Sequence, residues 1–97
     1  MNDLARAVPT DVRVTNVTHN QLRVTYSSIA GAQSYNVSAT PLDDTLQAVT
    51  ETLVTGTSVL LINLEASQAY NIDVNANYKT GSGNPSVAVQ QYTGIKD

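Results

Sequence analysis

The chain has 97 residues, enough for one domain, with 41% hydrophobic and 13% charged residues, no Cys, a single His and a net charge of -3. It can therefore build neither a disulfide framework nor a structural zinc site, and its stability depends on packed apolar side chains. Five scattered Lys and Arg give no basic surface for nucleic acid, and no apolar run is long enough to cross a membrane or opens the chain as a signal peptide.

Short segments of the chain alternate apolar and polar residues, and turn residues separate them, which is the pattern of β-strands. No segment holds the 3.6-residue period of an amphipathic helix. The domain is predicted to span residues 9–94, because the patterned part begins at Pro9. Residues 1–8 are expected to be a leader or linker, and residues 95–97 a tail.

The first half of the domain is predicted to contain three strands. Residues 11–17 form the first strand, with a bulge near Asn16 because Val17 falls out of the alternation. The second strand spans residues 21–27, and the third spans residues 34–40. The side chains of these strands that are expected to face inward are those of Val12, Val14, Leu22, Val24, Tyr26, Tyr35, Val37 and Ala39.

The second half is predicted to contain four more strands. A weak strand at residues 47–53 and a nearly all-apolar strand at 58–64 precede residues 70–78, which show the cleanest alternation in the chain. A loop at 80–85 with two Gly and one Pro leads into the last strand, residues 86–93. Seven short strands joined by polar turns indicate an all-β, antiparallel, immunoglobulin-like sandwich of two stacked sheets.

The order of these residues resembles a fibronectin type III domain, and the resemblance covers nearly all of residues 9–93. It depends on a Pro, a Val-rich first strand, Tyr-x-Val, Leu-x5-Tyr and a closing Pro with Val-x-Val and Thr. In this chain these are Pro9, Val12, Val14, Tyr35, Val37, Leu64, Tyr70, Pro85, Val87, Val89 and Thr93. Residues 14–20 with the Leu-Arg-Val that follows, and residues 30–35, are similar to repeats of fibril-associated collagens and related matrix proteins.

The most specific part of this resemblance is the pair Leu64 and Tyr70, which resembles the tyrosine corner of the family. The resemblance implies that the Tyr70 ring fills the edge of the core while its hydroxyl bonds to the backbone a few residues upstream. Two departures are visible. Tyr26 stands where the family usually has Trp, and Ala66 and Gln68 stand where the corner usually has Pro and Thr.

No set of residues has the composition of a catalytic or metal site. His19 is the only imidazole and lies in a predicted turn, and no Gly-x-Ser-x-Gly motif is present. The adjacent Asp43 and Asp44 supply fewer oxygens than calcium requires. The chain is therefore predicted not to be an enzyme and to hold no metal or cofactor. The loop at 80–86 also lacks the Arg-Gly-Asp motif with which some family members bind integrins.

Two N-glycosylation sequons are present, at Asn16-Val17-Thr18 and Asn36-Val37-Ser38. Alternation places Asn36 on the outward face of its strand, where an acceptor must lie. Such triplets also arise by chance in a chain rich in Asn, Ser and Thr, so modification and coincidence are both open.

Two apolar side chains, Leu60 and Ile62, are expected to point outward from the strand at 58–64. Arg13 and Arg23 are expected on the same face, because the first, second and fifth strands should share a sheet. Two interpretations are open: the Arg stems cover the two aliphatic side chains, or the four residues form a contact patch for a neighbouring module or another partner.

The resemblance implies a non-catalytic structural and interaction module, a spacer or adhesion repeat of a multidomain extracellular matrix or cell-surface protein. Its expected partners are neighbouring modules of the same chain and matrix or cell-surface proteins; nucleic-acid binding and membrane insertion are not expected. The alternative is an accessory module of a secreted carbohydrate-active enzyme or of a receptor ectodomain. An extracellular location follows from either, and a targeting signal would then lie outside this sequence.

Overall fold

The structure is a computed structural model that describes residues 8–95 except Thr80, Asn84 and Val87. The expected leader therefore lies outside the described residues except for Val8, and so do residues 96–97 of the expected tail. The predictions for Thr80, Asn84 and Val87 also lie outside them.

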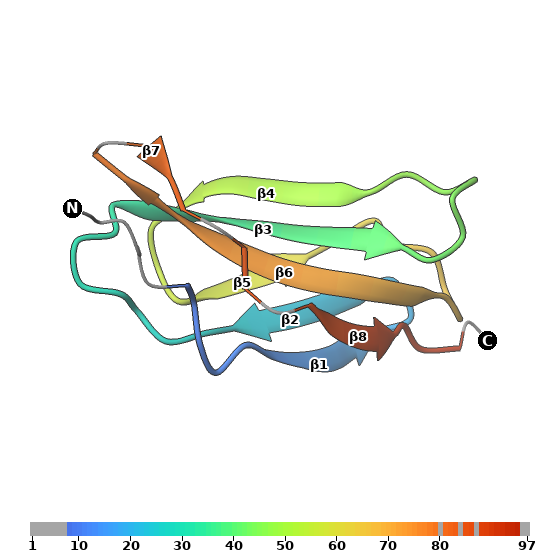
Figure 1. Ribbon diagram of the computed structural model, residues 1–97. Helices are drawn as coiled ribbons and strands as arrows, with labels where there is room; N and C mark the ends of the chain where they lie inside the picture. The colour runs from blue at the N-terminus through green and yellow to red at the C-terminus, as the bar shows by residue number, and fades with distance from the viewer. Residues whose placement is uncertain (1–7, 80, 84, 87, 96–97) are drawn as a thin grey trace.

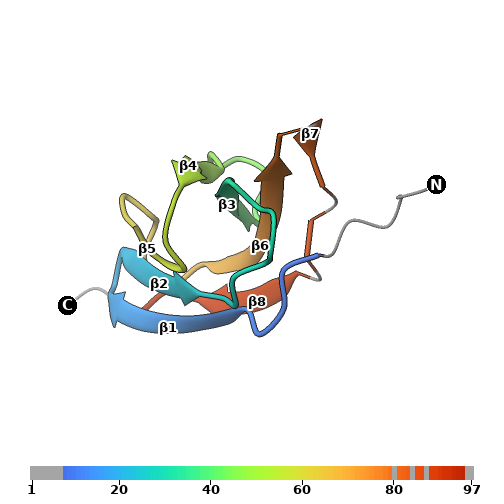
Figure 2. The same ribbon diagram turned by 90° about the vertical axis from the view of Figure 1, so that its left-hand side faces the viewer.

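The described residues form eight β-strands and no helix: β1 (Arg13–Thr18), β2 (Gln21–Thr25), β3 (Ser34–Pro41), β4 (Val49–Val54), β5 (Ser58–Leu61), β6 (Ala69–Tyr78), β7 (Gly81–Ser82) and β8 (Val89–Tyr92). One sheet has the strand order β1-β2-β5. The other has the order β4-β3-β6-β7, and β8 also pairs with β6. The two antiparallel sheets stack as a sandwich (Figure 1, Figure 2), which confirms the predicted fold class.

The core lies between the sheets and is built from the inward positions of the alternating strands. Side chains from β2, β3 and β6 dominate it, because these strands are central in their sheets or follow the alternation most strictly. The buried apolar residues are Leu22, Val24, Tyr26, Tyr35, Val37, Ala39, Leu61, Leu64, Tyr70, Ile72, Val74 and Ala76. The inward positions predicted for the second and third strands are all among them. The alternation of residues 70–78 predicts Tyr70, Ile72, Val74 and Ala76 as inward, and these are buried too.

Most strand ends differ from the predicted ones by one to three residues, and two differences change the strand assignment itself. Gly81 and Ser82 pair with the end of β6 as a two-residue strand, which makes eight strands instead of seven. β5 ends at Leu61 and does not continue to Leu64, because Asn63 adopts a left-handed backbone with φ of 64°. This turn lets Leu61 and Leu64, three positions apart, both point into the core.

The strands contain two irregularities. The pairing of β1 with β2 shifts register between Asn16 and Thr18, where the sequence predicts a bulge. A second shift occurs in β4, opposite the β3 segment between Tyr35 and Val37. Leu53 lies at this shift with φ of 56° and is 71% exposed. Because β4 is an edge strand, the irregularity makes its free edge a poorer template for pairing with another chain.

The described chain begins and ends at opposite poles of the sandwich (Figure 1). At the N-terminal pole, the Ser27 amide after β2 donates a hydrogen bond to the Thr10 carbonyl at 3.0 Å. At the C-terminal pole, Gly94 packs against the backbone of His19, just before β2. Eight residue steps lead from His19 through β2 to Ser27, so the two poles are at most about 26 Å apart along this strand.

The facing of β5 can be tested by truncating two adjacent leucines. Leu61→Ala should lower the free energy of unfolding by about 2–5 kcal/mol, because the Leu61 side chain is fully buried. Leu60→Ala should cost much less, because Leu60 lies on the outer face opposite Arg23. Urea unfolding of both variants measures the difference, and equal losses would contradict this facing.

Candidate functional site

The tyrosine at position 70 joins the two sheets at the C-terminal pole. The β5–β6 loop crosses from the three-stranded to the five-stranded sheet, and Tyr70 follows it at only 1% exposure. The Tyr70 Oη accepts a hydrogen bond from the Glu65 amide at 2.8 Å. Leu64 is buried beside it, and the Leu64 amide donates to the Asn20 carbonyl in the β1–β2 turn at 3.0 Å. The loop backbone is thus held by the Tyr70 phenol and by the Asn20 carbonyl.

A set of hydrogen bonds also fixes the segment that leaves β8. The buried Thr93 hydroxyl donates to the Glu65 carbonyl at 2.6 Å and accepts from the Gln68 amide at 3.0 Å. The Thr93 amide donates to the Gln68 carbonyl, and the Ser67 amide donates to the Gly94 carbonyl, both at 2.9 Å. We call these five residues the C-terminal clamp. The sequence placed Thr93 only in a closing pattern, and nothing in it indicated these bonds.

Tyr26, which replaces the family's usual Trp, pairs with a second buried tyrosine. The rings of Tyr26 and Tyr35 lie 4.8 Å apart between centroids and are tilted by 56°. The Tyr26 hydroxyl donates to the Gly56 carbonyl at 2.8 Å, and the Tyr35 hydroxyl accepts from the Ile29 amide at 2.8 Å. Both phenols therefore satisfy loop backbone at the N-terminal pole. Burial, with Tyr35 adding to it, raises the pKa of Tyr26 to about 12.

The four residues of the expected contact patch lie on the outer face of the three-stranded sheet, but they do not adjoin as one group. Arg23 pairs directly with Leu60, and its Nη1 donates to Ser58 Oγ at 3.4 Å, away from Ile62. Arg13 lies two strands from β5, at about 16 Å from Ile62 by the usual strand spacings. Ile62 is 41% exposed, and neither Arg is placed to cover it.

The two sequon asparagines have different surroundings. Asn16 is exposed in the β1 bulge, and its Oδ1 accepts from Gln91 Nε2 at 3.1 Å. Asn36 lies half-buried on the outer face of β3, where its Oδ1 accepts from the Leu53 amide at 3.2 Å and from Asn77 Nδ2 at 3.1 Å. Asn36 therefore helps to hold the β4 irregularity. Glycosylation of either residue remains a prediction.

The remaining candidates for chemistry lie in turns. His19 is half-buried in the β1–β2 turn, where Gly94 covers its backbone. Asp43 closes its own turn: its Oδ1 accepts from the Thr45 hydroxyl and amide, which lower its pKa. Over the described ranges, no three His, Cys, Asp or Glu residues gather in a group that could hold a metal ion. The described part of the chain also has no helix that is long and apolar enough to cross a membrane.

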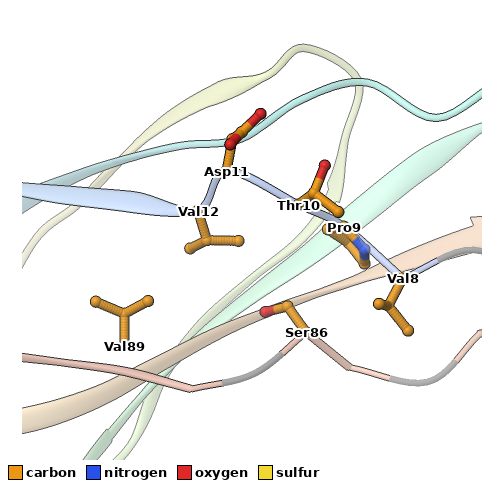
Figure 3. Close-up of a pocket in the computed structure, with 7 residues that line it drawn as sticks. All are labelled: Val8, Pro9, Thr10, Asp11, Val12, Ser86 and Val89. Carbon is orange, nitrogen blue, oxygen red and sulfur yellow. The ribbon is translucent and has the colours of Figure 1, made fainter.

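A cleft of about 380 Å³ lies on one flank, between the segment that precedes β1 and the segment that leads into β8 (Figure 3). Val12 and Val89 point toward each other across it, and Asp11 points away. Two of its polar side chains are already engaged: the Ser86 hydroxyl accepts from the Val74 amide at 3.0 Å, and the Asp11 carboxylate accepts from the Ser27 hydroxyl at 3.0 Å. The cleft thus presents mainly apolar side chains and no reactive group.

The sequence model of the fibronectin type III domain matches residues 7–92. The fn3 domain of the human collagen alpha-1(XX) chain is similar in structure, with a TM-score of 0.84, 19% identity, and coverage of 100% of this chain and 93% of that one. The FN5 domain of Drosophila Lar has a TM-score of 0.81 and 20% identity, with coverage of 95% of this chain and 100% of that one. The FN1–FN3 domains of chicken CNTN1 have a TM-score of 0.77 and 25% identity. That match includes 95% of this chain and 32% of the three-domain chain.

Removing the Tyr70 hydroxyl tests the corner. Tyr70→Phe should lower the free energy of unfolding by about 1–3 kcal/mol, because the part-buried Glu65 amide loses its acceptor. Tyr92→Phe is the matched control, because that ring is 62% exposed, and it should leave the stability nearly unchanged. Guanidinium unfolding compares the two, and an unchanged midpoint for Tyr70→Phe would contradict the assignment.

The buried Tyr26 phenol should make the fold sensitive to alkali. Because burial raises its pKa from 10.0 to about 12, the stabilisation of the neutral phenol is present below pH 10 and is lost as the pH rises through 12. The stability of the wild type should therefore fall more steeply than that of Tyr26→Phe between these pH values. Urea midpoints from pH 9 to 12 measure both slopes; parallel curves would show that the folded pKa is not raised.

Proposed function

Because the chain belongs to the fibronectin type III family, we propose that it is a non-catalytic spacer and interaction module of a multidomain extracellular matrix or cell-surface protein. Domains of this family are typical of multidomain extracellular or cell-surface proteins. The similar structures include a domain of a collagen chain and a run of three domains in CNTN1. The proposed location outside the cell and the proposed matrix or cell-surface partners rest on this likeness.

The observation that carries the proposal is the position of the two ends of the domain. Thr10 is tied to Ser27 at one pole, and Gly94 packs on His19 at the other. Neighbours attached at these ends would extend along the long axis of the sandwich and would not cover its faces. A module of this shape separates its neighbours by a fixed length and leaves both sheet faces free for contact.

The described surface supports binding or mechanics more than catalysis. The single His has its backbone packed under Gly94, and the exposed Asp43 is occupied within its own turn. The flank cleft is lined mainly by apolar side chains, and its Ser86 and Asp11 are engaged in hydrogen bonds within the domain. The alternative role, an accessory module of a secreted carbohydrate-active enzyme or receptor ectodomain, differs in its neighbours and not in this module.

Excision of the module from the full-length protein tests the proposal. Limited proteolysis is expected to release a fragment of about the 10.3 kDa of this chain that keeps its fold, because its core is complete without its neighbours. Its thermal midpoint should stay within a few degrees of the value inside the protein, and electron microscopy of the intact protein should show a string of separate domains. A fragment that unfolds on excision, or turnover of a substrate that His19→Ala abolishes, would contradict the proposal.

A further inference from the structure

Exposed apolar side chains gather at the C-terminal pole of the domain. Among the described residues, seven large hydrophobic side chains are exposed. Val8 and Leu53 are the two that lie elsewhere. The other five are Val17, Leu42, Ile62, Tyr92 and Ile95, which we call the apolar rim. Singly exposed apolar residues are ordinary, whereas their concentration at one end of a domain is a sign of contact.

The register of the strands brings part of the rim together on the outer face of the five-stranded sheet. Ala69 pairs with Tyr92 on β8, and on its other side the Ala69 carbonyl accepts from the Leu42 amide at 3.0 Å. Leu42 and Tyr92 therefore flank Ala69 in one row, about 10 Å apart by the spacing of neighbouring strands. Two residues that are 50 positions apart in the sequence thus form an apolar row in the rim.

The other rim residues continue around the same pole. Ile62 follows β5 directly, beside the start of β2, and Val17 lies in the β1 bulge just before the β1–β2 turn. Ile95 is 82% exposed and comes directly after Gly94, the last residue of the C-terminal clamp. Because the clamp fixes Thr93 and Gly94, the chain leaves the rim from a set position and direction.

The size of the rim indicates which kind of partner it fits. A free partner in a stable complex covers roughly 800 Å² on each side, and five partly exposed side chains offer less than that. A tethered neighbour needs less contact, because a short linker gives it an effective concentration of about millimolar. The chain leaves the domain through this pole, so a tethered neighbour would be delivered to the rim.

We propose that the apolar rim is the docking surface for a module of the same fold that follows on the same chain, so that the joint between the two is fixed. This rests on the proposed function as one of several linked modules. The charges agree with such a head-to-tail contact. Asp43, Asp44 and Glu65 lie exposed around the C-terminal pole. The N-terminal pole that a similar module would present carries Arg13 and Lys79 and one exposed carboxylate, Asp11, so it is the more basic of the two poles.

The test compares this chain alone with the same chain extended through the segment that follows it in the full-length protein. Docking should raise the Tm of this module by about 4–8 °C in the extended protein, which is the shift that about 1 kcal/mol of added stability produces in a domain of this size. The combined variant Leu42→Ser, Tyr92→Ser and Ile95→Ser should lose that gain. Leu53→Ser, away from the rim, is the control and should keep it. Small-angle scattering of the extended protein should show one fixed joint angle.

Three results would overturn the proposal. An extended protein with no gain in Tm and a flexible joint would leave the tandem arrangement intact but remove the docking. Dimers of the isolated chain that the combined variant dissolves would assign the rim to a second copy. A full-length protein in which no domain follows this one would exclude the docking. If no domain precedes it either, the proposed function fails as well.

Discussion

The fold depends on how the loop between β5 and β6 passes from one sheet to the other. Backbone groups in such a crossing lie beyond the reach of either ladder, and leaving them buried without partners would cost about 1–3 kcal/mol each. Tyr70 and Thr93 supply the partners, since the phenol accepts from the Glu65 amide and the hydroxyl bonds to the Glu65 carbonyl and the Gln68 amide. A Cys-free sandwich of this size therefore closes one end with two buried hydroxyl groups.

The sequence predicts the parts of this fold that follow a strict period. Val74 and its neighbours on β6 alternate without interruption, so their inward facing could be read directly and is confirmed. The bulge at Asn16 could be read from a break in phase. The end of β5 was missed, because Asn63 leaves the alternation through its backbone φ. Asn adopts a left-handed backbone more often than most residues, but a single Asn in an apolar run is a weak signal of a strand end. Periodicity reports side chains and says little about single backbone dihedrals.

The candidate surfaces were also predictable only in part, since alternation predicts which face a residue lies on but not which residues of that face are neighbours. Alternation correctly placed Arg23 and Leu60 on one outer face, but the distance of Arg13 from Ile62 depends on strand order and register, which only the pairing of β1, β2 and β5 defines. The apolar rim was not predicted, because Leu42 and Tyr92 lie 50 residues apart in the sequence. They come onto one face only because each is a neighbour of Ala69 in the sheet. A pole of a sandwich is assembled from turns, and turns carry the weakest pattern in the sequence.

The clamp gives the same residues a role in stability and in any tandem assembly. Force applied beyond Ile95 would reach Thr93 and Gly94 first, where several hydrogen bonds connect them to the β5–β6 loop. Each such bond contributes about 0.5–1.5 kcal/mol, and bonds that share one rigid segment must break together. Such a force would therefore act on these hydrogen bonds before it reached the core that packs behind Tyr70. A joint fixed at this pole can transmit orientation to a neighbour because the segment that enters it is already ordered by the fold.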